Sequence, residues 1–183
     1  TLAAGLLFGG YGIVRAVGKN RLYQKSSAGQ IAMPEAHEEE KLTAAEKEKW
    51  QDGWVKYKDV VYAYNEEILT FLIMGIDKAS DVEEAAKGTD GGQADALFLA
   101  VLNPKDKRIK VIGINRNTMT DVDVYDGNGE YVSTVKSQIA IQHGFGNGME
   151  ESCEYQKKAV ANLFYQLPIH GYAAVNMSAI ATI

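Results

Sequence analysis

Three short apolar runs in the middle of the chain each have a polar side chain at one end. Residues 69–76 are followed by Asp77, residues 108–114 by Asn115 and Arg116, and residues 96–102 are preceded by Asp95. Continuous apolar runs of this length are typical of buried strands in an α/β sheet, where ligands bind at strand ends and in the adjoining loops. Two carboxylates and an arginine in such positions predict a site for a metal ion and a phosphate.

Asp77 and Asp95 are the candidate metal ligands of this site. Mg²⁺ prefers hard oxygen ligands, keeps several waters, and is usually held by one or two carboxylates together with substrate phosphates. The planar guanidinium of Arg116 suits two parallel hydrogen bonds to a phosphate. The alternative for both aspartates is structural, with each carboxylate capping a nearby helix.

The charge of the chain argues against a nucleic-acid partner. The net charge is −5, and residues 1–34 carry four basic residues and no acid, so the remainder carries −9. A protein that binds the phosphate backbone of a nucleic acid needs a basic face. With 46% hydrophobic and 23% charged residues, the 183-residue chain is expected to form one globular domain and a tail.

The chain begins with an apolar run of fourteen residues that contains four glycines. A membrane-spanning helix needs roughly 20 apolar residues, so we expect the remnant of such a helix or the core of a signal peptide. The glycines favour the remnant over a buried helix of a soluble domain. We therefore expect an anchor remnant and basic flank in residues 1–25 and a linker in residues 26–52. That linker contains a short helix, starting at a capping box from Thr43 to Glu46, and residues 53–183 form the folded domain.

An amphipathic helix is predicted near the end of the chain. Residues that can face a core recur every three to four positions from Met149 to Leu167, and Cys153 falls on this stripe. Cys153 is therefore expected to be a small core residue rather than a nucleophile. His143 and His170 are isolated in the sequence, and we expect them to pack or to form hydrogen bonds rather than to catalyse.

The order of these motifs resembles that of the LytR-CpsA-Psr family. The residues that carry the resemblance are Gly75-Ile76-Asp77, Gln93-Ala94-Asp95-Ala96, Asn115-Arg116-Asn117-Thr118, Lys136 ahead of a helix at Ile139, and Val175-Asn176-Met177. The resemblance covers residues 68–183. It implies a three-layer α/β/α sandwich with a central mixed sheet, preceded by a membrane anchor and a linker.

The resemblance also implies an activity in the cell envelope. The family's enzymes are Mg²⁺-dependent phosphotransferases, in which Mn²⁺ can serve as well, and they move a glycopolymer from a polyprenyl-pyrophosphate carrier to peptidoglycan. Such glycopolymers are teichoic acids or capsule polymers, and the domain stands on the extracellular face of the cell membrane behind a single-pass anchor. The family pattern assigns Asp77 and Asp95 to the metal, Asp95 and Arg116 to catalysis, and Gln93, Arg116, Asn117 and Lys136 to the substrate.

Two positions depart from the family pattern. Gln93 stands where the family has an arginine, and Asn117 where it has an aspartate. Because a neutral amide binds phosphate less strongly than a guanidinium, phosphate affinity is expected to fall. The sequence thus leaves open a noncatalytic module that binds polyprenyl pyrophosphate, a pyrophosphatase that uses water as acceptor, and a plain surface position for Lys136. The chain also ends before further arginines of the family, so we expect the sequence as given to hold part of a site and to be inactive.

Overall fold

The computed structural model describes residues 43, 45, 49–51, 54–78, 91–148 and 150–180. By its contacts the chain separates into two compact units, Thr1–Ala32 and Met33–Ile183, and all described residues belong to the second. The expected anchor remnant and most of the expected linker lie outside the described residues. Within the short helix expected there, Ala45 and Lys49 are helical. None of the helices in the described ranges is long and apolar enough to cross a membrane.

A small hairpin comes first among the described strands. β1 (Trp54–Tyr57) and β2 (Val60–Ala63) pair antiparallel. They are joined by Lys58 and Asp59, whose φ angles are 48° and 60°. Positive φ at both central residues belongs to the two-residue turn whose twist matches that of paired strands.

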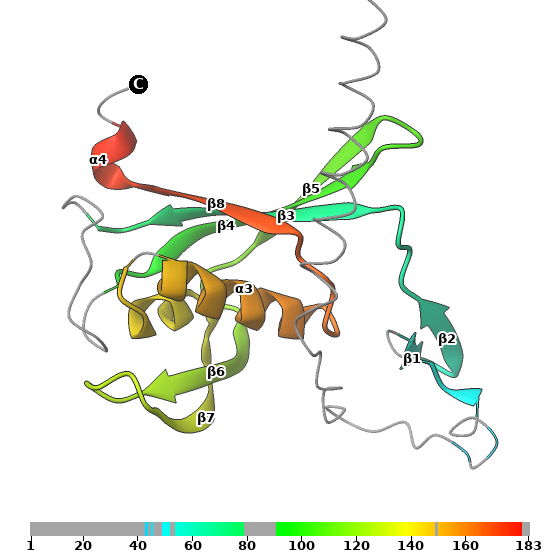
Figure 1. The fold of residues 1–183 in the computed structure, drawn as a ribbon, viewed down its shortest axis with the longest axis horizontal. Helices are drawn as coiled ribbons and strands as arrows, with labels where there is room; N and C mark the ends of the chain where they lie inside the picture. Colours follow the sequence, from blue (N-terminus) through cyan, green and yellow to red (C-terminus); the bar gives the residue numbers. More distant parts are fainter. Residues whose placement is uncertain are drawn as a thin grey trace, which may run out of the picture. The chain divides into compact units, whose positions relative to one another are not determined.

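The central sheet has four strands in the order β5-β4-β3-β8 (Figure 1). These are β3 (Leu69–Ile76), β4 (Ala94–Asn103), β5 (Arg108–Ile114) and β8 (Gly171–Asn176). β3, β4 and β5 are antiparallel neighbours, whereas β8 runs parallel to β3. The three apolar runs are therefore strands of one mixed sheet, as predicted. One boundary differs, because Asp95 is the second residue of β4 rather than a residue ahead of it.

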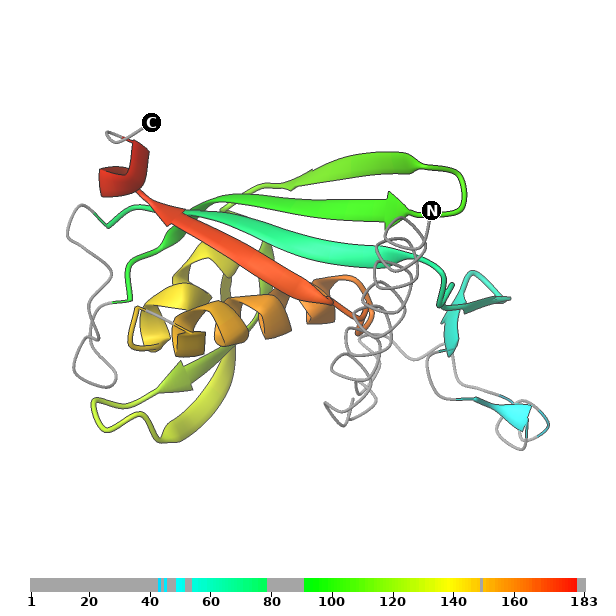
Figure 2. The same cartoon turned by 45° about the horizontal axis from the view of Figure 1, so that its top comes forward.

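Two helical segments cover one face of this sheet. They are η1 (Ile139–Phe145), a 3₁₀ helix, and α3 (Glu150–Leu163), the predicted amphipathic helix. A short helix, α4 (Met177–Ile180), follows β8 and lies outside this layer (Figure 1). β6 (Met119–Tyr125) and β7 (Tyr131–Gln138) form a hairpin on the far side of α3 from the sheet (Figures 1 and 2). The order of layers is thus sheet, helices and hairpin.

The hydrophobic core lies between the central sheet and the helices. Alternate residues of β3 and β4 point into it, because side chains of a strand alternate between the two faces of its sheet. The core residues are Leu72, Met74, Ile76, Ala94, Leu97, Leu99, Ile114, Ile139, Cys153, Ala159, Val160 and Ile169. The cysteine is therefore a core residue, as predicted.

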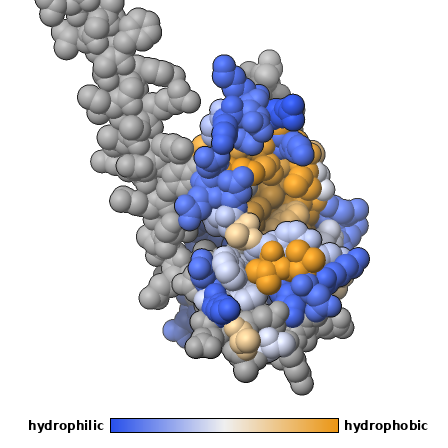
Figure 3. Space-filling view, turned by 90° about the vertical axis from the view of Figure 1, so that its right-hand side faces the viewer, coloured by the Kyte–Doolittle hydropathy of each residue, from blue (hydrophilic) through white to orange (hydrophobic). Residues whose placement is uncertain are grey.

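The opposite face of the sheet carries exposed apolar side chains. Ile73 is 42% exposed and Phe98 is 43% exposed, and the two are paired across β3 and β4. Ile109, Val111 and Val175 share this face and are also exposed. Figure 3 shows hydrophobic residues gathered in patches between hydrophilic ones. In the described part of the chain, α3 and η1 supply one helical layer, and the second layer of the expected sandwich stays a prediction.

Candidate functional site

Asp77 and Gln93 join the ends of β3 and β4 through two hydrogen bonds. The backbone N–H of Asp77 donates to the Gln93 carbonyl oxygen at 3.0 Å. In return the backbone N–H of Gln93 donates to Oδ1 of Asp77 at 2.6 Å. The carboxylate is therefore oriented by its neighbouring strand, and a bulge at Gly75 and Ile76 lies directly beside it.

The side chain of Arg116 links Gln93 to Asp95. Its Nη2 donates to Oε1 of Gln93 at 2.8 Å, and its Nη1 is 2.5 Å from Oδ1 of Asp95. Its carbonyl oxygen accepts a hydrogen bond from the N–H of Ala140 at 3.3 Å, which ties the loop after β5 to η1. The Arg116 and Asp95 side chains are 37% and 39% exposed, so solvent reaches the pair.

Four of the sequence-predicted residues thus form one continuous chain of contacts, which we call the site chain: Asp77, Gln93, Arg116 and Asp95. They come from the end of β3, from β4 and the residue before it, and from the loop after β5. Two acids and one guanidinium at a solvent-exposed strand edge form an arrangement that can hold a cation and an anion together.

The remaining two candidates lie differently. The backbone N–H of Asn117 donates to Oδ1 of Asn115 at 2.9 Å, a local turn contact. Lys136 lies near the end of β7, three residues ahead of η1, which begins at Ile139 as predicted. Its Nζ is 2.9 Å from Oδ1 of Asp121, within the β6–β7 hairpin that the sequence analysis did not predict. A substrate role for these two residues stays a prediction.

The donor set of the site chain fits a magnesium ion. Asp77 and Asp95 each use Oδ1 in a contact with a neighbouring donor. A carboxylate has two oxygens and can accept several bonds, so each can also ligate a cation. The described residues contain no group of three or more His, Cys, Asp or Glu side chains placed to hold a metal. A metal held by two carboxylates needs further oxygens from water and substrate, which is the usual arrangement for Mg²⁺.

His143 lies behind the site chain and was not predicted to belong to it. Its side chain is 1% exposed, and its Nδ1 is 3.0 Å from the carbonyl oxygen of Gly92, the residue before Gln93. Burial lowers the pKa of His143 below its usual value. In the sequence this contact left no signal, because its partners are 51 residues apart.

The other buried histidine has a structural role, as expected. The backbone N–H of Thr70 donates to Nδ1 of His170 at 3.1 Å, which joins the start of β3 to the residue before β8. Cys153 is also unlike a nucleophile, because burial raises the pKa of its thiol to about 11. Reactive cysteines have lowered pKa values, so this one is inert.

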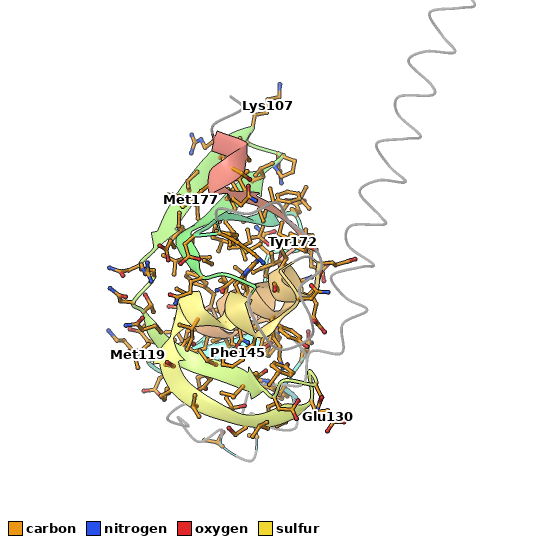
Figure 4. All side chains as sticks on the ribbon, turned by 90° about the vertical axis from the view of Figure 1, so that its left-hand side faces the viewer. Lys107, Met119, Glu130, Phe145, Tyr172 and Met177 are labelled. Atoms are coloured by element: carbon orange, nitrogen blue, oxygen red, sulfur yellow. The ribbon has the colours of Figure 1, made fainter. Side chains whose placement is uncertain are left out.

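A cavity of about 320 Å³ is lined by Ile76 and Lys78, the two neighbours of Asp77 in the chain. Its lining residues include Ile76, Lys78, Gly91, His143, Cys153, Tyr172 and Asn176. Figure 4 shows Tyr172 beside the helical layer, and Phe145 close to the β6–β7 hairpin. The latter ring lies 6.5 Å from that of Tyr125. Phe145 is therefore packed away from the cavity, whose lining comes mainly from β8 and the ends of β3 and α3.

Comparison with known proteins identifies related sequences. The LytR_cpsA_psr family model matches residues 27–183. A polyisoprenyl-teichoic acid–peptidoglycan teichoic acid transferase TagU of Bacillus cereus is 30% identical over 112 residues, which are 61% of this chain and 30% of that protein. The protein of the same name from Enterococcus faecalis is 26% identical over 121 residues, or 66% of this chain and 34% of that protein. The chain spans about a third of the length of these curated relatives.

The solved structures that match this chain are more distant in sequence. Protein gbs0355 of Streptococcus agalactiae matches with a TM-score of 0.45 and 19% identity, over 61% of this chain and 34% of that one. The transcriptional regulator yvhJ of Bacillus subtilis matches with a TM-score of 0.40 and 24% identity, over 62% of this chain and 41% of that one.

Proposed function

Because this chain belongs to the LytR_cpsA_psr family, we propose that it transfers a cell-wall glycopolymer from a polyprenyl-pyrophosphate carrier to peptidoglycan. The names of the relatives support this substrate class, since they describe transferases of teichoic acid to peptidoglycan. The observation that carries the proposal is the site chain, in which Arg116 contacts Asp95 and the side chain of Gln93, and the backbone N–H of Gln93 contacts the Asp77 carboxylate.

In this proposal Arg116 binds the pyrophosphate. A guanidinium has five N–H donors, and the contacts with Asp95 and Gln93 use one on each terminal nitrogen. These contacts fix the plane of the group, so its other donors are held in one orientation toward a ligand. A planar, oriented guanidinium favours two parallel bonds to a phosphate over the single contact of a lysine.

Asp77 and Asp95 would hold Mg²⁺, with Mn²⁺ as a substitute. When bound, the metal supplies positive charge that neutralises the phosphate oxygens as the leaving group departs. The acceptor hydroxyl of peptidoglycan forms a bond to the phosphorus that carries the glycopolymer. The bond from this phosphorus to the bridging oxygen breaks, polyprenyl phosphate leaves, and the hydroxyl proton passes to Asp95.

The same proposal includes the surroundings of the domain. We propose that residues 1–25 are part of a single-pass membrane anchor and that the domain works on the extracellular face, where polyprenyl carriers and peptidoglycan meet. We also propose that a second helical layer covers the exposed face of the sheet, giving the three-layer sandwich. The exposed side chains of Ile73, Phe98 and Val111 support this, because apolar patches of a sheet are normally buried.

Turnover of a polyprenyl-pyrophosphate-linked saccharide, with a peptidoglycan fragment as acceptor, tests the proposal. The chain is extended past Ile183 for this assay, so that the further arginines of the family are present. We expect transfer with Mg²⁺, none with EDTA, and a loss of at least about 100-fold in Asp95→Asn and in Arg116→Ala, because both contact the reacting group. Asp106→Asn and Arg108→Ala are matched controls, since they lie near the far ends of β4 and β5. Transfer that survives EDTA or the two site variants would contradict the proposal.

One observation favours a second candidate, a module that binds polyprenyl pyrophosphate without turnover. Gln93 brings no charge to the site, and its Oε1 is used in holding Arg116. For such a module, binding of the carrier persists in EDTA while no saccharide is released. Release of the saccharide phosphate without an acceptor would instead identify a pyrophosphatase that transfers the group to water.

A further inference from the structure

Two glycines ahead of β4 are enclosed between the site chain and the helical layer. A Cβ on Gly91 would lie 2.5 Å from the carbonyl oxygen of His143, on η1, and 2.5 Å from Oγ of Ser152. A Cβ on Gly92, whose φ is +73°, would lie 3.2 Å from Oδ1 of Asp77. The backbone of this segment therefore touches the helices on one side and the site chain on the other, with no room for side chains between them.

His143 makes three contacts, one of them with this segment. Its Nδ1 is 3.0 Å from the Gly92 carbonyl oxygen, its Nε2 is 3.8 Å from Sγ of Cys153, and its backbone N–H donates to Oε1 of Gln156 at 3.1 Å. A carbonyl oxygen can only accept, so Nδ1 carries the proton and donates. In the neutral ring Nε2 is then the acceptor, and the thiol of Cys153 donates to it.

The neutral form of the ring is consistent with its surroundings. His143 is almost fully buried, and burial lowers its pKa while it raises that of the Cys153 thiol to about 11. Both groups therefore stay uncharged at neutral pH, and the direction of each hydrogen bond is determined. A single buried path leads from the thiol through the imidazole to the Gly92 carbonyl.

We propose that His143 is a positioning residue for the pyrophosphate site, an inference that rests on the function proposed above. By holding the Gly92 carbonyl, His143 fixes the peptide plane that ends in the N–H of Gln93, and this N–H donates to Oδ1 of Asp77 at 2.6 Å. The side chain of Gln93 also holds Arg116, since its Oε1 accepts a hydrogen bond from Nη2 of Arg116 at 2.8 Å. His143 thus acts on the metal-binding carboxylate and on the phosphate-binding guanidinium through one backbone segment.

The competing explanation is that His143 only fills space. A pair of variants of equal size separates the two, because asparagine and leucine have the same number and branching of side-chain atoms. His143→Asn keeps an N–H donor near the position of Nδ1, whereas His143→Leu has none. Both leave the same small cavity, so any difference between them reports on the hydrogen bond to Gly92.

The first measurement needs no ligand. Hydrogen exchange of the Gln93 amide, followed by NMR on the full chain, reports whether its bond to Asp77 is held. We expect exchange to be about tenfold faster in His143→Leu than in His143→Asn, the factor that one hydrogen bond of typical net strength represents. Val160→Ala, which opens a cavity in α3 without contact to this segment, controls for general loss of stability.

The second measurement is the dissociation constant of farnesyl pyrophosphate in the presence of Mg²⁺, at a temperature where all variants are folded. We expect binding to weaken about tenfold in His143→Leu and to be largely restored in His143→Asn. Equal Gln93 exchange or equal affinity in the two variants would overturn the inference. If the unmodified chain does not bind farnesyl pyrophosphate, the proposed function fails, and the exchange difference still decides whether His143 positions Gln93.

Discussion

Replacement of Gly91 by alanine tests the close contact behind the site. The new Cβ would lie 2.5 Å from the His143 carbonyl oxygen, 2.5 Å from Ser152 Oγ and 3.0 Å from the Gly146 carbonyl oxygen, whereas ordinary contact begins at 3.4 Å. Two of these neighbours are backbone atoms, so the segment itself has to move by about 1 Å. Overpacking of this kind costs about 1–3 kcal/mol. We expect the upper end, about 3 kcal/mol, which lowers the melting temperature of a chain of this size by about 6–12 °C.

Thermal unfolding followed by circular dichroism measures this effect. Gly127→Ala is the matched control, because no atom lies within 4 Å of the added Cβ in the turn between β6 and β7. We expect the control to change stability by no more than about 0.5 kcal/mol. The reasoning is refuted if Gly91→Ala melts at the same temperature as Gly127→Ala.

Three further predictions follow from the site and the core. Gln93→Arg is expected to raise the affinity for farnesyl pyrophosphate by about tenfold, because a charge-assisted hydrogen bond is stronger than a neutral one. The same change should lower the melting temperature of the ligand-free chain, because the new cation lies beside the like charge of Arg116. Calorimetry measures the affinity and thermal melts measure the stability, and an unchanged affinity would contradict the prediction. The free energy of unfolding should fall as pH decreases below about 6.5, since burial lowers the pKa values of His143 and His170 and the unfolded chain then binds more protons than the native one. Urea unfolding between pH 7.5 and 5.5 tests this, and His143→Asn should flatten the profile. The thiol of Cys153, with a pKa of about 11, should react with a disulfide reagent only on unfolding, and rapid reaction of the native chain would show that the thiol is accessible.

Part of the candidate site followed from local sequence. The apolar runs before Asp77 and Arg116 were long enough to be recognised as strands, and polar residues at strand ends meet at a sheet edge. The structure joins Asp77, Gln93, Asp95 and Arg116 in the expected neighbourhood. Their roles in metal and phosphate binding stay predictions.

The hairpin of β6 and β7 was missed, although its signals were present. Both runs alternate, and the residues 126–129 between them are Asp-Gly-Asn-Gly, which is typical of a turn. In the structure Oδ1 of Asp126 accepts hydrogen bonds from the backbone N–H groups of Asn128 and Glu130, both at 2.9 Å. Lys136 belongs to the second strand of this hairpin, and the helix predicted at Ile139 follows directly after that strand.

The sequence by itself determined the three apolar strands, the amphipathic helix, the burial of Cys153 and the position of acids and arginine at strand ends. These depend on the order of apolar and polar residues over a few positions, which sets which face of a strand or helix is buried. Only the tertiary structure decided that His143 holds the Gly92 carbonyl and that Gly91 has no space for a side chain. Such contacts join residues about 50 positions apart, and they exist only after η1 and α3 have packed against the sheet, so no local pattern encodes them.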